Sequence, residues 1–233
     1  MEIKKVYCLF EQSGTFKKAF QAFGYDAIDV DIENSFNETN LVCNIFDEIN
    51  AACNGKSSIF DKITKNDLIL AFFPCTYFSP QSQLQFMSSS RLYRGLSNEE
   101  ICDRIIARDT KRSQYYQHLL RLIKICFARN LRIIIENPGN GTNYLICGQN
   151  FFKKPDLIDY NRRERGDKFV KPTAYWFFNC QRTYGHSDKK IKIKKTVLKS
   201  SGFERSTIEY DYAENFIRDF ILGKEKSRQL SIF

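Results

Sequence analysis

A cysteine and a glutamate each stand directly after a buried strand, and these two residue types can perform nucleophilic and acid chemistry. Cys75 follows Asp67, the apolar run 68–73 and Pro74, a pattern typical of a fully buried parallel strand that proline stops. Glu136 follows the apolar run 131–135 in the same way. Open α/β sheets place their chemistry at the carboxyl ends of strands. Neighbouring parallel strands would therefore bring the thiol of Cys75 and the carboxyl of Glu136 to one rim of the sheet.

The alternative for Cys75 is a small buried apolar residue, because free cysteine is among the most buried residue types. The chain has 8 cysteines, and none lies closer than ten residues to the next, which predicts neither a paired-cysteine metal site nor a compact disulfide framework. We read this spacing as that of a protein from a reducing compartment.

The elements that must position these residues alternate between strand and helix. A strand over 5–10 leads through the turn Ser13-Gly14-Thr15 into a helix, and a strand over 27–31 ends on Asp31. An acid about twenty residues after such a turn is where nucleotide-binding folds hydrogen-bond a ribose, although a tight strand-to-helix connection would give the same turn.

Further elements continue this alternation. We expect a brief strand over 41–46, a helix over 47–52, a helical turn over 60–63, a mobile loop over 81–95, a helix that Ser97 caps and Asn130 closes, and a helix over 210–222. The fold class predicted is α/β, with a doubly wound, mostly parallel, Rossmann-like sheet.

The bulk composition indicates a globular chain with a preference for polyanions. A hydrophobic content of 42% is ample for a core, and a net charge of +9 with 36 Lys and Arg favours nucleic acid as a partner, although a basic surface also serves solubility. The first residues carry no apolar signal core, and no apolar run approaches the roughly 18 residues that a membrane span needs. We therefore expect a soluble, cytoplasmic protein.

Taken together, the order and spacing of these motifs resemble the cytosine-5 DNA methyltransferase family, in its compact phage-like and bacterial form. The resemblance covers most of the chain: residues 9–16 resemble the first cofactor motif, Asp31-Ile32 the ribose-binding acid, Pro74-Cys75 with Phe78-Ser79 the nucleophile motif, and Glu136-Asn137-Pro138 the acid motif, with proline in place of valine. It implies a class I S-adenosylmethionine-dependent methyltransferase fold with a covalent Cys75 adduct and Glu136 as the acid.

The resemblance also implies a set of residues for each role. S-adenosylmethionine would be held by Phe10, Glu11, Ser13, Gly14, Thr15, Phe16, Asp31, Ile32, Asn44, Ile45 and Pro74. Arg163 and Arg165 would steady the base and the catalytic loop, and DNA would be contacted by Ser79, Arg91, Arg94, Lys192 and Lys194.

Two departures from the family pattern bear on these roles. Asn44 stands where the family normally offers an acid to the adenine amino group. The family's Gln-x-Arg-x-Arg motif fits residues 161–165 with asparagine in place of glutamine, or falls on residues 171–176 without its arginines. The alternative for residues 162–165 is a solvated basic turn.

The chain ends on a peptide that resembles a docking motif. We expect one catalytic domain over 1–223, with no separate large target-recognition domain, and a charged linker and docking peptide over 224–233. Gln229, Leu230, Ile232 and Phe233 resemble the peptide by which bacterial DNA-processing enzymes bind the replicative sliding clamp, although these apolar residues could also fold back onto the protein itself.

Two other functions fit the same motifs. One is a related enzyme that modifies another pyrimidine or RNA, and the other is a non-catalytic module that binds DNA or the clamp and keeps a relic cofactor site. Retention of Cys75 and Glu136 favours an enzyme, whereas loss of the motif arginines favours the module.

Overall fold

A seven-stranded mixed, mostly parallel sheet forms the centre of the protein in the computed structural model, which describes residues 2–184 and 207–223. The strand order is β3-β2-β1-β4-β5-β7-β6; the first five strands run parallel, β7 is antiparallel to β5, and β6 is antiparallel to β7. The strands are β1 (Lys5–Leu9), β2 (Asp26–Asp31), β3 (Leu41–Val42), β4 (Leu68–Phe72), β5 (Arg132–Pro138), β6 (Leu157–Asp159) and β7 (Thr173–Phe178). The predicted α/β class is confirmed.

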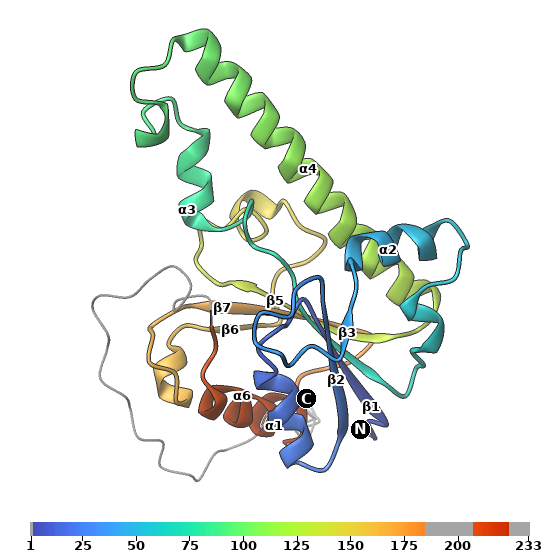
Figure 1. Ribbon diagram of the computed structural model, residues 1–233. Helices are drawn as coiled ribbons and strands as arrows, with labels where there is room; N and C mark the ends of the chain where they lie inside the picture. Colours follow the sequence, from blue (N-terminus) through green and yellow to red (C-terminus); the bar gives the residue numbers. More distant parts are fainter. Residues whose placement is uncertain (1, 185–206, 224–233) are drawn as a thin grey trace, which may run out of the picture.

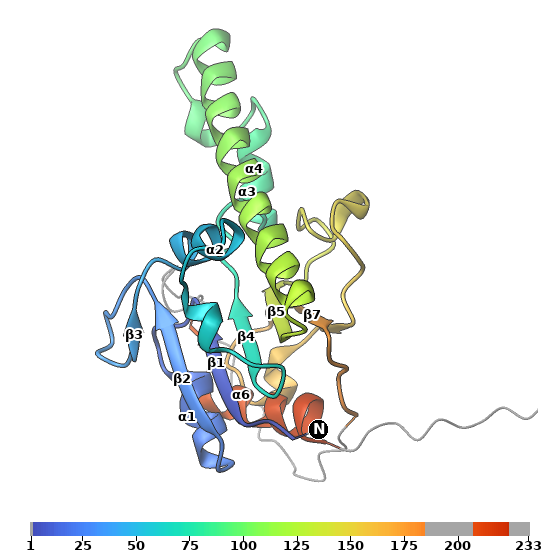
Figure 2. The same ribbon diagram turned by 90° about the vertical axis from the view of Figure 1, so that its right-hand side faces the viewer.

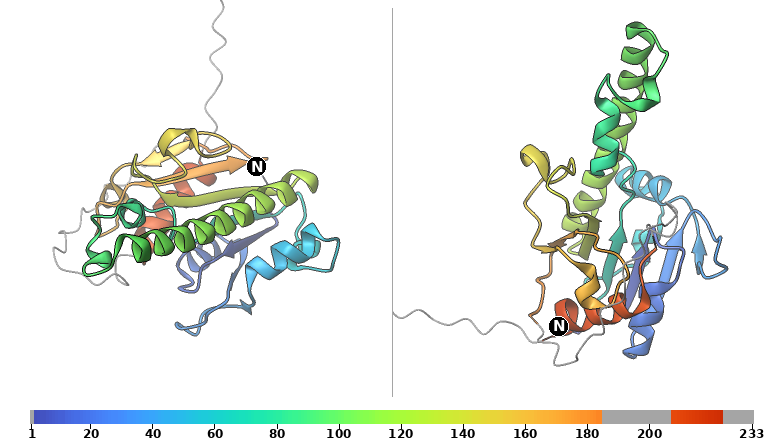
Figure 3. Two further views of the ribbon diagram at one scale, coloured as in Figure 1. Left: turned by 90° about the horizontal axis from the view of Figure 1, so that it is seen from above. Right: turned by 90° about the vertical axis from the view of Figure 1, so that its left-hand side faces the viewer.

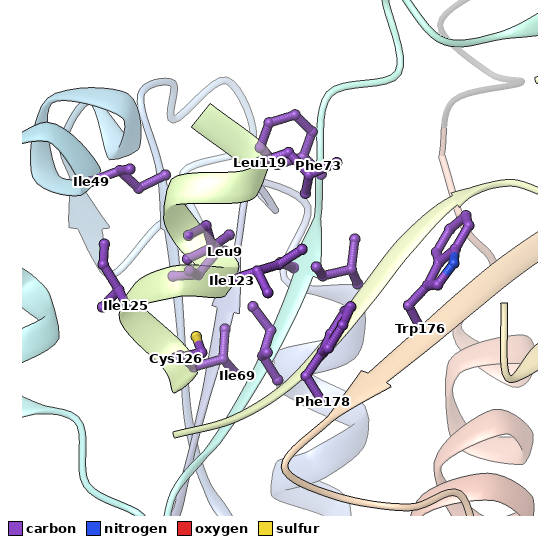
Figure 4. Close-up of a cluster of buried hydrophobic side chains, with 14 of the residues drawn as sticks. Leu9, Ile49, Ile69, Phe73, Leu119, Ile123, Ile125, Cys126, Trp176 and Phe178 are labelled. Atoms are coloured by element: carbon purple, nitrogen blue, oxygen red, sulfur yellow. The ribbon is translucent and has the colours of Figure 1, made fainter. Parts of the chain in front are cut away.

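Helices cover both faces of this sheet (Figure 1). One face packs against α1 (Thr15–Ala22) and α6 (Tyr210–Phe216), which a π-helical turn, η6 (Ile217–Ile221), extends. The other face packs against α2 (Ile45–Cys53) and the carboxyl end of α4 (Asn98–Ala128). Figure 4 shows this second core, in which Leu119 and Ile123 of α4 lie over Leu9 and Ile69 of the strands. Burial of both sheet faces explains why the central strands read as continuous apolar runs.

The predicted strands at the site are confirmed with shifts of a few residues at their ends, whereas the strand over 41–46 is wrong beyond Val42. The side chain of Asn44 accepts a hydrogen bond from the backbone N–H of Phe46, so it caps α2, and Ile45 and Phe46 begin that helix. An N-cap asparagine satisfies a free N–H of the first turn, and this local bond ends the strand early.

The segment after Cys75 is built from short helices where a loop was expected. It contains α3 (Pro80–Gln83) and the 3-10 turns η2 (Leu84–Phe86) and η3 (Arg91–Tyr93). Other 3-10 turns are η1 (Ile59–Lys62), η4 (Cys147–Gln149) and η5 (Arg162–Arg165). The capping of α4 by Ser97 is confirmed, because Ser97 and Glu100 form a reciprocal capping box.

Residues 80–118, which we name the arm, project away from the sheet (Figures 2 and 3). The arm is held together by arginines of α4: the guanidinium of Arg112 lies 4.1 Å from the ring centroid of Phe86, and Arg108 donates to the Ser82 hydroxyl over 2.8 Å. Between Ile101 and Leu119 no residue of α4 is fully buried. The arm therefore leaves the domain as a largely solvent-covered helical extension.

Among the described residues, no helix is both long and apolar enough to span a membrane.

Candidate functional site

Cys75 and Glu136 lie at the carboxyl ends of adjacent strands and face one cavity. The strands β4 and β5 pair in parallel, with Phe72 opposite Glu136, and Cys75 follows three residues after Phe72. A cavity of about 680 Å³ is lined by both residues. This volume is within the range of small-molecule sites, and the predicted meeting of the thiol and the carboxyl at one rim is confirmed.

Glu136 is a buried acid whose carboxyl makes no hydrogen bond to any described residue. Its exposed fraction is 9%, and burial raises the pKa of its carboxyl above the ordinary value. The cations of Lys171 and Arg162 act in the opposite direction on this pKa, with less effect. An acid whose neutral form is favoured by desolvation is suited to donate a proton at neutral pH.

Cys75 is a half-buried thiol whose pKa is raised. Burial has the largest effect, the carboxyl of Glu136 adds to it, and the cation of Lys171 opposes both. The raised pKa favours the thiol over the thiolate at neutral pH.

Lys171 is the cation that the cysteine and the glutamate share, and sequence reasoning did not select it. It lines the cavity two residues before β7, in the segment that the alternative alignment of the arginine motif occupies. Pro138 of β5 pairs with Thr173 of β7, and the Gly139 N–H donates to the Pro172 carbonyl over 2.7 Å. This pairing brings residue 171 to the end of the Glu136 strand.

Gly139 is required at this point because a Cβ there would lie 2.8 Å from the backbone of Thr173. Asn137 makes the second link at this edge: its amide donates to the Phe73 carbonyl over 2.9 Å, and its oxygen accepts from Asn143 over 3.0 Å. Asn137 is fully buried. Its bonds tie the strand that carries Glu136 to the segment that leads to Cys75.

The same cavity is also lined by most of the residues expected to hold a cofactor. The predicted set that lines it comprises Phe10, Glu11, Ser13, Phe16, Asp31, Ile32, Asn44, Ile45 and Pro74, whereas Gly14 and Thr15 do not line it. Gly14 adopts a φ of 69°, in the left-handed region that favours glycine. Additional lining residues that were not predicted include Phe46, Phe73 and Tyr115.

Three polar residues of this set have defined partners. Glu11 accepts hydrogen bonds from the Ser13 hydroxyl over 2.6 Å and from the Thr15 N–H over 2.7 Å. Asp31, at the end of β2, accepts from the backbone N–H of Glu33, and burial raises its pKa. Asn44 uses its oxygen to cap α2 and its amide to bond Asp47, so its side chain is already engaged at the cavity wall.

The structure does not bring the predicted catalytic arginines into the cavity lining. Arg165 forms ion pairs with Asp159 over 3.0 Å and with Asp219 over 2.7 Å. Arg162 is fully buried and pairs with Asp167, which contradicts a solvated turn at this residue. The geometry therefore gives Arg162 and Arg165 tertiary ion pairs, and places Lys171, not Arg163 or Arg165, at the cavity.

The residues expected to contact DNA lie on the arm or outside the described ranges. Ser79 caps α3 at the base of the arm, and Arg91 and Arg94 are exposed on and beside η3. Lys192, Lys194 and the clamp-docking residues Gln229, Leu230, Ile232 and Phe233 lie outside the described residues. Their roles stay predictions.

Comparison with known proteins adds no relative to this picture: no protein-family model and no curated protein matches the chain. Within the described ranges, no group of three or more His, Cys, Asp or Glu side chains is arranged to hold a metal ion. The site is therefore interpreted from its own geometry.

Proposed function

We propose that this protein is an S-adenosylmethionine-dependent methyltransferase that methylates carbon 5 of cytosine in DNA through a covalent bond to Cys75. The observation that carries the proposal is a thiol and a buried acid at the ends of two adjacent parallel strands, facing one cavity. The strand order, with β7 antiparallel between β5 and β6, fits the sheet of class I methyltransferases.

The chemistry of the cavity fits this cofactor better than a dinucleotide. Folds that bind dinucleotides place the pyrophosphate against backbone N–H groups at the start of the first helix. Here the Glu11 carboxylate accepts the Thr15 N–H at that position. A negative side chain there disfavours a phosphate and favours a ligand with a cationic end, while Asp31 remains as a ribose acceptor at the end of β2.

In the proposed reaction Cys75 loses its proton, and its sulfur forms a bond to carbon 6 of the cytosine ring. Glu136 gives its proton to ring nitrogen 3, so negative charge does not build up on the ring and carbon 5 becomes nucleophilic. Bound S-adenosylmethionine supplies a methyl group on a sulfonium. A base then takes the carbon 5 proton, the sulfur–carbon 6 bond breaks, ring nitrogen 3 returns its proton to Glu136, and Cys75 departs as a thiolate.

Lys171 supports the first step because its cation acts on both reacting groups. Its charge acts against burial on the pKa of Cys75, which favours the thiolate, and it acts in the same direction on Glu136, where burial nevertheless keeps the pKa raised. The target base must leave the duplex, or be single-stranded, to reach a cavity at the sheet edge. The arm begins five residues after Cys75, and its exposed Arg91 and Arg94 are proposed to contact phosphates beside the flipped base.

The test is a trapping experiment with DNA that contains 5-fluorocytosine, in the presence of labelled S-adenosylmethionine. Fluorine cannot leave carbon 5 as the proton does, so the sulfur–carbon bond persists. We expect a labelled adduct that resists denaturation, and no adduct with Cys75→Ser. Cys53→Ser, at an exposed cysteine, is the matched control and should keep the adduct.

No adduct with either single- or double-stranded DNA would contradict the proposed substrate. The same fluorinated base in RNA then tests the alternative of an RNA-modifying enzyme. An adduct that survives Cys75→Ser would contradict the assigned nucleophile.

A further inference from the structure

Glu11 is a buried carboxyl at the cavity that has one oxygen without a partner. Its exposed fraction is 7%, and it lines the cavity. Its Oε1 accepts from Ser13 and Thr15, whereas its buried Oε2 makes no hydrogen bond to any described residue. A buried polar atom that lacks a partner costs free energy, so a free acceptor beside a cavity indicates a donor on the ligand.

The charge around Glu11 is also unbalanced. Two other buried acids form ion pairs: Lys17 pairs with Asp29 over 3.1 Å, and Arg162 pairs with Asp167. The groups that act on the pKa of Glu11 are hydroxyl and amide donors and the acid Asp29, and burial, the largest influence, raises this pKa. A cation delivered by the ligand would supply the missing charge.

We infer that Glu11 binds the α-ammonium group of the amino-acid part of S-adenosylmethionine, an inference that rests on the proposed cofactor. A primary ammonium carries N–H donors for Oε2, whereas the sulfonium carries none, so the free acceptor selects the ammonium. The hydrogen bonds of Oε1 to Ser13 and Thr15 fix the carboxylate, which makes the acceptor preorganised.

Two ligands and one isosteric substitution test the assignment. S-adenosylhomocysteine carries the ammonium, and its deamino analogue, with a carboxypropylthio chain, lacks only that group. Glu11→Gln keeps an oxygen for Ser13 and Thr15 and replaces the free oxygen by an NH₂ donor. We expect this variant to bind S-adenosylhomocysteine about 10- to 100-fold more weakly in calorimetry and the deamino analogue unchanged.

Matched variants separate this role from a general effect on the cavity. Glu99→Gln changes an exposed acid in the first turn of α4, outside the cavity lining, and it should leave the affinity for both ligands unchanged. Asp31→Asn removes the proposed ribose acceptor and should weaken both ligands together. If Glu11→Gln does not fold, the wild type serves: its preference for S-adenosylhomocysteine over the deamino analogue should shrink as acid protonates Glu11.

The possible failures are distinguishable. The assignment would be overturned if Glu11→Gln weakened the binding of both ligands equally or of neither. It would also be overturned if the wild type showed no preference between the ligands, or a preference independent of pH. Each of these results would leave the proposed cofactor intact. A wild type that binds neither ligand would overturn the proposed cofactor, and the assignment with it.

Discussion

Two buried glutamates face the same cavity, yet their surroundings give them opposite chemistry. Burial raises the pKa of both carboxyls. Glu11 receives hydrogen bonds from Ser13 and Thr15, which favour the carboxylate, whereas Glu136 receives none from the described residues. Cations act on Glu136 through Lys171 and Arg162, whereas no cation is among the influences on Glu11.

The difference shows that neighbours, more than depth, decide what a buried acid does. Hydrogen bonds to Oε1 favour the charged form of Glu11 against its burial and leave its other oxygen for a cationic ligand. Desolvation without hydrogen bonds favours the neutral form of Glu136, which then has a proton to give. We therefore expect Glu11 to hold a cationic ligand and Glu136 to transfer a proton.

The strongest test of this division is Glu136→Gln, compared with Glu11→Gln. Loss of the general acid should lower the methylation rate at saturating cofactor by about 100-fold or more. The affinity for S-adenosylhomocysteine should not change, because Glu136 is on β5, two strands away from β1, which Glu11 follows. Single-turnover methylation and calorimetry on the same preparation give both quantities. If Glu136→Gln lost as much affinity for S-adenosylhomocysteine as Glu11→Gln, the two glutamates would not have the separate roles proposed for them.

Lys171→Gln sharpens the comparison, because Lys171 acts on the Cys75 end of the cavity alone. Removal of its cation raises the pKa of the Cys75 thiol, so less thiolate is present at a given pH. We expect alkylation of Cys75 at pH 7.5 to slow by about 3- to 10-fold, with the rate profile moved to higher pH. Peptide mass spectrometry isolates Cys75 from the other thiols.

Lys5→Gln provides the control for that measurement. Lys5 pairs with Asp26 over 3.0 Å at the start of β1, away from the cavity lining. Removal of the Lys5 cation should leave the pH dependence of Cys75 alkylation unchanged. An equal shift in both variants would show that overall charge, not Lys171, sets the thiol pKa.

A smaller effect is expected on folding stability, with a defined sign in pH. The folded-state pKa of Glu136 is raised, so its contribution to stability is fully present below the unfolded pKa and is lost as pH rises through the folded value. Glu136→Gln, which cannot ionise, should therefore gain stability over the wild type by about 1 kcal/mol at pH 8 and less at pH 5. Urea unfolding at the two pH values measures this difference, and a gain independent of pH would contradict it.

The sequence predicted the strands that carry the site because burial on both faces leaves a continuous apolar run. The runs before Cys75 and Glu136 have this form, and β4 and β5 are indeed adjacent. Asn44 misled the prediction of β3, because an N-cap is a local bond that apolar patterning does not record. The first part of the arm, over 81–95, was read as a loop because its short helices pack against Arg108 and Arg112, which lie more than twenty residues from their partners.

The charges of the site were the least predictable part. Lys171 reaches Glu136 only through the antiparallel pairing of β5 with β7, which no local pattern encodes. Arg165 read equally well as catalytic or solvated and Arg162 as part of a solvated turn, because their acids, Asp167, Asp159 and Asp219, could be assigned only once the chain had folded. Residue type predicted the chemistry, and tertiary pairing decided which residue supplies it.

The uneven burial of α4 divides this helix into two units of different local stability. Its 31 residues span about 46 Å at 1.5 Å per residue, but only the last turns, from Leu119 onward, enter the core continuously. Amide hydrogens there should exchange with solvent only on global unfolding, whereas those between Ile101 and Leu119 should exchange through local opening at a lower free energy. The arm can thus loosen while the strands that hold Cys75 and Glu136 stay closed.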